Sequence, residues 1–208
     1  SHIERVLAQD LLWFAHCGQV NSMLGAFVSE TENTKIVLPY ACSTICRLMR
    51  DKLKKEVLAE SRAIVRYVAD KNKDEGAPLY GSTLEERALT EQWLEVESQN
   101  FTPALQPIFY QLFVCPMRGL PVDLSIVEAN LPKFAKVLDI YEERLRTTPY
   151  LAGDFFGLAD LTHLPFLQNV VPKPEVAELF HSRPNVLAWW RRISERPAWK
   201  KVVSLAHA

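Results

Sequence analysis

Apolar positions in the second half of the chain recur at helical spacing. The clearest run repeats every three or four residues, at Val127, Leu131, Phe134, Leu138, Tyr141 and Leu145. A period near 3.6 residues predicts a long amphipathic helix with one buried face. A second helix is predicted over residues 84–99. We expect it to end or bend near Pro103 and Pro107, because proline lacks a backbone N–H.

The segment 158–167 is apolar on nearly every side, which predicts a buried helix. Asp160, at its third position, can reach back to the start of the helix as half of a capping box. Gly157 stands where a serine or threonine would complete that box. Because glycine is itself tolerated at a helix start, the missing hydroxyl is expected to cost about a few tenths of a kcal/mol.

Residues 74–83 gather glycine, proline and polar residues between two helical patterns, which is typical of a linker. We place a domain boundary there, with an N-terminal part over 1–78 and a helical domain over 82–208. Within the N-terminal part, residues 34–38 (TKIVL) are a candidate for a short strand. The predicted fold class is therefore α+β, mainly α, with an all-helical second half.

Composition narrows the function classes. With 48% hydrophobic and 24% charged residues among 208, the chain is an ordinary globular protein by composition. A net charge of −1 gives no electrostatic signature for nucleic acid or an anionic membrane. No apolar run approaches a membrane span, and the start lacks a secretory pattern, so a cytoplasmic location is expected. The four cysteines are irregularly spaced, and neither they nor His16 and His163 have metal-ligand spacing, so we expect reduced thiols and no metal.

The run Leu58–Tyr67 (LAESRAIVRY) places an acidic residue, Glu60, and a hydroxyl, Ser61, at the start of a predicted helix. The first backbone N–H groups of a helix lack internal partners and form the positive end of its dipole. Such an end can bind an anion. The alternative role of the pair is to cap the helix and nothing more.

This run, together with residues 93–98 (WLEVES) and 151–163 (LAGDFFGLADLTH), resembles the cytosolic glutathione transferases, and the plant phi class in particular. The resemblance covers about Leu58 to the C-terminus and fails over most of residues 1–57. It implies a glutathione-transferase-like fold with a thioredoxin-like N-terminal part and an all-helical C-terminal domain. We expect the N-terminal part to be incomplete, because residues 44–59, which separate Ser43 from Glu60, are too few to supply the family's intervening sheet.

The resemblance also implies a catalytic role for Ser43, because Ala41–Arg47 is similar to the family's strand-to-helix turn. A hydroxyl there can donate a hydrogen bond to the sulfur of glutathione and favour the thiolate, which attacks an electrophile. Capping a helix is the alternative role of Ser43. Cys42 supports another chemistry, a mixed disulfide with glutathione, and its alternative role is that of a small buried apolar residue. Glu60 and Ser61 are expected to bind the γ-glutamyl end of glutathione.

An apolar cleft for the second substrate is also implied. Phe109, Phe113 and Met117 are its candidate wall residues, and packing in the core is an equal alternative for each. Trp189 and Trp190 are expected to pack against the N-terminal half. We therefore expect a glutathione transferase that conjugates its co-substrate glutathione to small hydrophobic electrophiles, as a homodimer without nucleic-acid or membrane partners. The alternative function is a non-catalytic, transferase-like carrier of hydrophobic ligands.

Overall fold

The computed structural model describes residues 61–74 and 77–206, and within these ranges the regular structure is helical. The chain divides into two compact units, one made of residues 1–78 with 196–208 and the other of residues 79–195. The expected thioredoxin-like part thus falls mostly outside the described residues. The domain division over 1–78 and 82–208 stays a prediction for the same reason.

The first unit contributes two described helices, α4 (Ser61–Lys71) and α13 (Pro197–Ala206). The second unit, which we call the helical unit, contains α5 (Leu84–Val96), η1 (Glu97–Phe101), α6 (Thr102–Phe109), η2 (Tyr110–Val114), α7 (Cys115–Met117), α8 (Leu124–Leu145), α9 (Leu158–Leu161), α10 (Leu164–Val170), α11 (Pro174–His181) and α12 (Pro184–Ser194). The segments η1 and η2 are single π-helical turns. The all-helical second half predicted from the sequence is therefore confirmed over the described residues.

Helix α5 begins where the sequence predicts, at Leu84. Thr83 and Glu86 form a capping box, in which the Thr83 hydroxyl accepts from the Glu86 backbone N–H at 3.2 Å and the Glu86 carboxylate accepts from the Thr83 N–H at 3.3 Å. These bonds satisfy two N–H groups at the first turn, which helices otherwise leave without partners.

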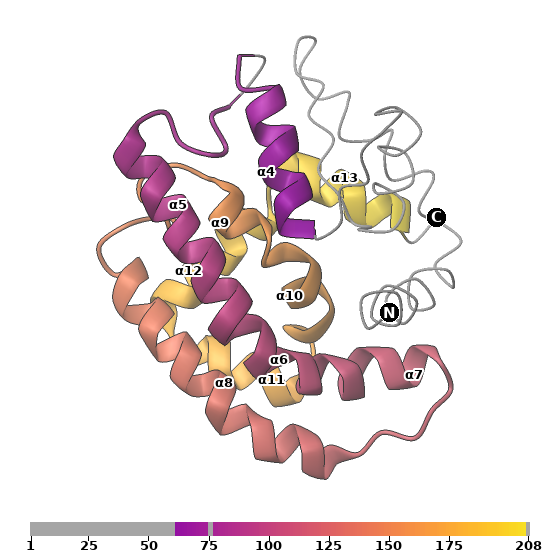
Figure 1. The fold of residues 1–208 in the computed structure, drawn as a ribbon. Coiled ribbons are helices and arrows are strands. Elements are labelled where there is room, and N and C mark those ends of the chain that lie inside the picture. The colour runs from indigo at the N-terminus through magenta and orange to yellow at the C-terminus, as the bar shows by residue number, and fades with distance from the viewer. Residues whose placement is uncertain (1–60, 75–76, 207–208) are drawn as a thin grey trace, which may run out of the picture. The chain divides into compact units, whose positions relative to one another are not determined.

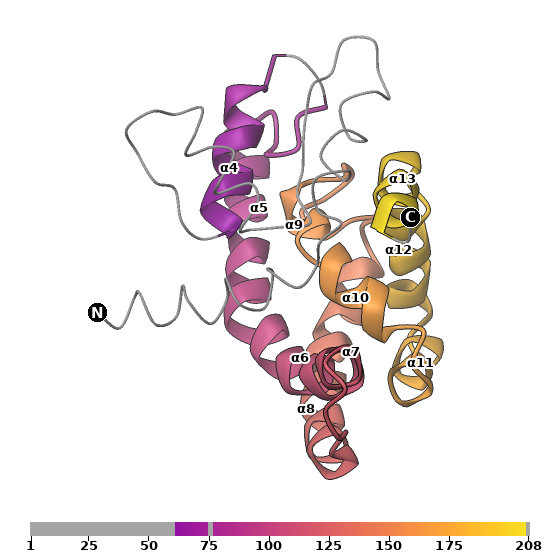
Figure 2. The ribbon, with the colours of Figure 1, turned by 90° about the vertical axis from the view of Figure 1, so that its right-hand side faces the viewer.

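The helix that begins at Leu84 does not end at the prolines but bends. The chain continues through α6 and η2 into α7, and the direction changes between α5 and α6 in both views (Figures 1 and 2). Each π-helical turn lies just before a proline, Pro103 after η1 and Pro116 after η2. A wider turn accommodates a residue whose ring would clash with the carbonyl one α-helical turn earlier.

Helix α8 confirms the amphipathic pattern read from the sequence. Its buried side chains are Val127, Phe134, Leu138, Tyr141 and Leu145, while Leu131 is half-buried. This buried face packs against α6 on one side and α12 on the other. The core of the helical unit lies between these helices.

The predicted single helix over 158–167 is wrong in one respect, because it is two short helices, α9 and α10. The chain turns at Thr162 and His163, and Pro165 follows at the start of α10. Pro165 has no N–H to donate to a carbonyl of the preceding turn, so one continuous helix would leave that carbonyl unsatisfied. The burial prediction is confirmed, since Leu158, Ala159, Leu161, Leu164 and Leu167 are all buried.

Candidate functional site

Ser61 is the first residue of α4 and its side chain is exposed. Val65 and Ala69, one and two turns further on, are buried, so one side of this eleven-residue helix is packed and its first turn is open to solvent. Asn72 closes the other end, where its side-chain amide donates to the Val68 carbonyl at 2.7 Å. Because Glu60 lies outside the described residues, the predicted helix start formed by Glu60 and Ser61 stays a prediction.

An aromatic cluster lies where α6 continues into η2. Phe109 is buried, and its ring lies 5.1 Å from that of half-buried Phe113 and 5.0 Å, edge-on, from that of Phe166 on α10. Met117, one turn beyond Phe113, is 42% exposed. The structure therefore brings together Phe109 and Phe113, adds Phe166 to them, and places Met117 at the surface.

Sequence reasoning missed Phe166 as a candidate for the ligand cleft. Phe166 lies in the segment 158–167, for which the sequence predicts one buried helix. In the structure Phe166 is half-buried and packs edge-on against Phe109. The break between α9 and α10 shifts the helical register, so a reading that assumes one helix misplaces this ring. Pro165, next to it, was the signal that could have revealed the break.

Asp160 is fully buried and holds three parts of the helical unit together. Its carboxylate accepts hydrogen bonds from the backbone N–H of Leu151 at 3.0 Å, the backbone N–H of Gly157 at 3.1 Å and the indole N–H of Trp189 at 2.7 Å. Burial raises the pKa of Asp160 to about 6, and the hydrogen bonds from these N–H groups act in the opposite direction. The predicted bond to the helix start is confirmed, and the other two bonds were not foreseen.

Gly157 is more constrained than the sequence indicates. A Cβ atom at this position would lie 2.9 Å from the carbonyl oxygen of Leu79. The Leu79 carbonyl also accepts the Leu158 N–H at 2.8 Å, so it is held in place. The absent side chain therefore allows residues 157 and 79 to approach closely, and the missing hydroxyl of the capping box is a consequence of packing.

The expected packing of Trp189 and Trp190 against the N-terminal half stays a prediction, because residues 1–60 lie outside the described residues. Trp189 is buried inside the helical unit, with its ring 6.1 Å from Tyr141 and 5.4 Å from His163. Val186, Trp189 and Ile193 recur along the buried face of α12, so the indole points to the unit's own core.

His163 has a structural role that the sequence did not indicate. It is buried, and its Nδ1 lies 2.7 Å from the carbonyl oxygen of Ala159, so Nδ1 carries the hydrogen. In the neutral ring Nε2 then accepts from the Tyr141 hydroxyl, 2.9 Å away. Burial, together with the charges of Glu97 and Asp160, raises the pKa of Tyr141 well above its ordinary value, which keeps this hydroxyl protonated.

Three predicted site residues, Cys42, Ser43 and Glu60, lie outside the described residues. Among residues 61–74 and 77–206, no group of three or more histidine, cysteine or acidic side chains could hold a metal ion. Over the same residues, no helix has both the length and the apolar character needed to cross a membrane. Cys115, the described cysteine, is buried with a free thiol.

Comparison with known proteins places these features in a family. The family model "Glutathione S-transferase, C-terminal domain" matches residues 105–197. Glutathione S-transferase F11 of Arabidopsis thaliana is 47% identical over 149 residues, which are 72% of this chain and 70% of that protein. This chain belongs to the phi class of the glutathione S-transferases. Glutathione S-transferase 1 of Zea mays is 45% identical to this phi-class chain over 148 residues, 71% of this chain and 68% of the maize protein.

Solved structures of phi-class transferases share the fold. Glutathione transferase F7 from Populus trichocarpa superposes with a TM-score of 0.72 at 36% identity, covering 91% of this chain and 95% of the poplar chain. Glutathione S-transferase I from maize, in complex with an atrazine glutathione conjugate, has a TM-score of 0.69 at 35% identity, covering 92% and 94%. The glutathione-transferase-like fold predicted from the sequence is therefore confirmed.

Proposed function

We propose that this chain catalyses the conjugation of glutathione to small hydrophobic electrophiles. Membership of the phi class is the observation that carries the proposal. Two solved structures of similar fold support it: glutathione S-transferase I from maize in complex with an atrazine glutathione conjugate, and a glutathione S-transferase I bound to lactoylglutathione. Glutathione is the co-substrate in this proposal, and its thiolate is the nucleophile.

Ser61 binds the γ-glutamyl end of glutathione in this proposal. Its hydroxyl and the first N–H groups of α4 receive the carboxylate, and Glu60 receives the ammonium group. The exposure of Ser61 at the first turn of an eleven-residue helix supports this role, since an incoming anion can reach the helix end. The burial of Val65 and Ala69 supports this role too, since it holds the opposite side of the helix away from solvent.

The electrophile binds beside the junction of α6 and η2 in this proposal. Phe113 and Met117 offer partly exposed apolar surface there, and Phe109 supports Phe113 from the buried side. Half-buried Phe166 extends the same aromatic cluster from α10. An apolar wall of this kind binds a hydrophobic group through the area that it removes from water, at about 25 cal/mol per Å².

Ser43 donates the hydrogen bond that stabilises the glutathione thiolate. Its neighbour Cys42 supplies the alternative chemistry, a mixed disulfide between its own sulfur and that of glutathione. The enzyme works as a cytoplasmic homodimer in this proposal. A non-catalytic carrier of hydrophobic ligands is the second candidate function, and the same cluster of Phe109, Phe113 and Phe166 supports it.

Retention on immobilised glutathione, followed by elution with free glutathione, distinguishes the two functions. The conjugating enzyme is retained and eluted specifically, and Ser61→Ala weakens the retention. Ser204→Ala is the matched control, because Ser204 is also an exposed helical serine. A folded wild-type protein that passes through the column would refute glutathione binding and support the carrier.

A further inference from the structure

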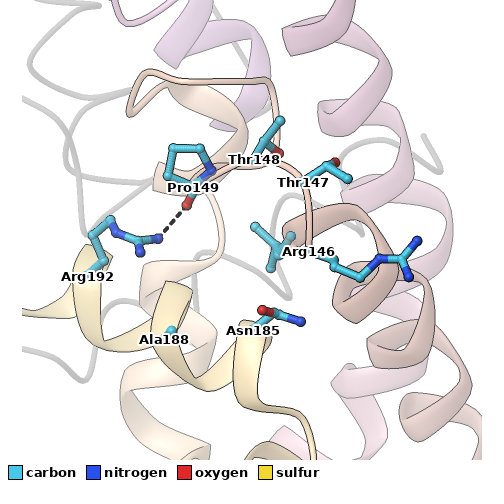
Figure 3. Close-up of a pocket in the computed structure, with 8 residues that line it drawn as sticks. Arg146, Thr147, Thr148, Pro149, Asn185, Ala188 and Arg192 are labelled. Atoms are coloured by element: carbon cyan, nitrogen blue, oxygen red, sulfur yellow. Dashed lines mark hydrogen bonds between the residues drawn. The ribbon is translucent and has the colours of Figure 1, made fainter.

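A hollow of about 260 Å³ lies in the helical unit, between the end of α8 and the side of α12. The loop formed by Thr147, Thr148 and Pro149 makes one wall, and Asn185 with Arg192 makes the other (Figure 3). No residue of this hollow belongs to the proposed glutathione or electrophile sites. The volume is below the ~300–1,000 Å³ of typical pockets for drug-sized molecules, which favours a small ligand.

The lining carries positive charge. Among the described residues that line the hollow are two arginines, Arg146 and Arg192, and no acidic side chain. Arg192 donates from Nη1 to the carbonyl oxygen of Pro149 at 2.6 Å, and its guanidinium carbon lies 5.6 Å from the centre of the Tyr150 ring. Both partners are neutral, so they orient the guanidinium without compensating its charge.

Arg146 also lines the hollow, and its guanidinium extends away from Arg192 (Figure 3). It pairs with Glu143 at 2.5 Å, but 64% of the Arg146 side chain and 69% of the Glu143 side chain are exposed. An exposed pair of this kind is worth about 0–1 kcal/mol, so a ligand anion can compete for Arg146 at little cost.

The two helix ends beside the hollow are already neutralised. The Glu142 carboxylate accepts the backbone N–H groups of Asn185 at 3.2 Å and Val186 at 2.9 Å, at the start of α12. At the end of α8, the Arg144 carbonyl accepts from the Thr147 N–H at 3.3 Å and from the Thr147 hydroxyl at 3.1 Å. Glu142 is therefore engaged by these N–H groups. Arg192, whose two partners are neutral, supplies the charge at the hollow, and Arg146, exposed and paired with Glu143, adds a second charge at its edge.

We propose that this hollow binds a small, multiply charged oxyanion, such as a phosphate or a polycarboxylate. A guanidinium presents parallel N–H groups that match the oxygens of both anions. Thr147, Thr148 and Asn185 surround the anion with further polar groups. The site lies on the helical unit and acts independently of glutathione binding.

Amide chemical shifts in nuclear magnetic resonance test the proposal on the full chain. Inorganic phosphate and citrate are the two probes, and sodium chloride at matched ionic strength is the control for screening. The variants are Arg192→Gln and Arg146→Gln. Arg191→Gln is the matched control, because Arg191 is exposed on the same turn of α12 but does not line the hollow.

We expect saturable shifts at residues 146–149 and 185–192 with at least one probe, with a dissociation constant in the millimolar range or lower. Arg192→Gln and Arg146→Gln each weaken that affinity about tenfold or more, Arg191→Gln leaves it within about twofold, and saturating glutathione does not change it. The absence of saturable shifts with both probes overturns the proposal. An equal loss of affinity in Arg191→Gln also overturns it, since that result indicates diffuse attraction to a basic surface.

Discussion

Replacing Asp160 should lower the free energy of unfolding of the helical unit. The size of the loss depends on how many N–H donors lose their acceptor. In Asp160→Asn the side-chain NH2 group must face at least one of the donors Leu151, Gly157 and Trp189, all of which now donate to the carboxylate. A buried donor without an acceptor costs about 1–3 kcal/mol, and we expect a loss in this range for Asp160→Asn. Asp160→Ala leaves all three donors unsatisfied and should cost more, about 3 kcal/mol at least.

The loss should also depend on pH. Burial raises the pKa of Asp160 from an ordinary value of 3.8 to about 6 in the folded chain. The folded chain therefore binds this proton more tightly than the unfolded chain does. The resulting stabilisation is fully present below about pH 3.8 and is lost as the pH rises through 6. The difference between the two pKa values corresponds to about 3 kcal/mol, so the loss in Asp160→Asn should be larger at pH 4 than at pH 7.

Urea unfolding followed by circular dichroism at both pH values measures these quantities. Asp154→Asn is the matched control, because Asp154 lies in the loop that precedes α9 and is exposed. We expect it to change the free energy of unfolding by no more than about 0.5 kcal/mol at either pH. An Asp160→Asn loss that is equal at pH 4 and pH 7, or no greater than that of Asp154→Asn, would refute the reasoning.

Two further substitutions test the packing of the same unit. Gly157→Ser should destabilise the helical unit by about 1 kcal/mol or more, because the new Cβ atom meets the fixed Leu79 carbonyl. Helix capping alone would predict a small gain in stability. A Gly157→Ser variant that is more stable than the wild type in urea unfolding would contradict the packing argument. Tyr141→Phe should cost about 0.5–1.5 kcal/mol, because it removes the hydrogen bond between the Tyr141 hydroxyl and Nε2 of buried His163. Tyr150→Phe, the half-buried control, should change the thermal midpoint little, and equal shifts in both variants would contradict the role of the hydroxyl.

The helical pattern predicts most of the helical unit because its signals are local. The period of α8 and the Thr83–Glu86 capping box at α5 both depend on residues within a few positions of each other. The split between α9 and α10 was within reach of the same reasoning, because Pro165 marks it. The apolar character of the segment 158–167 favours one continuous buried helix and does not indicate the break.

Contacts across long sequence distances could not be predicted in this way. The bond between Asp160 and Trp189 joins residues 29 positions apart, and the approach of Leu79 to Gly157 joins the start of the unit to its middle. Neither pair leaves a local pattern, since each depends on how the helices pack. The hollow at Arg146 and Arg192 is of the same kind, because Arg146 comes from the turn after α8 and Arg192 from α12.

Glutathione conjugation measured across pH tests the central claim most directly. The assay follows the absorbance of the conjugate formed from glutathione and a small aromatic electrophile, for the wild type, Ser43→Ala and Cys42→Ala. The account predicts glutathione-dependent turnover in the wild type and in Cys42→Ala. It predicts a loss in Ser43→Ala that is greater at neutral than at alkaline pH, because removing the hydrogen bond raises the pKa of the bound thiol. Absence of turnover in a folded wild type, or a loss in Cys42→Ala with Ser43→Ala spared, would contradict it.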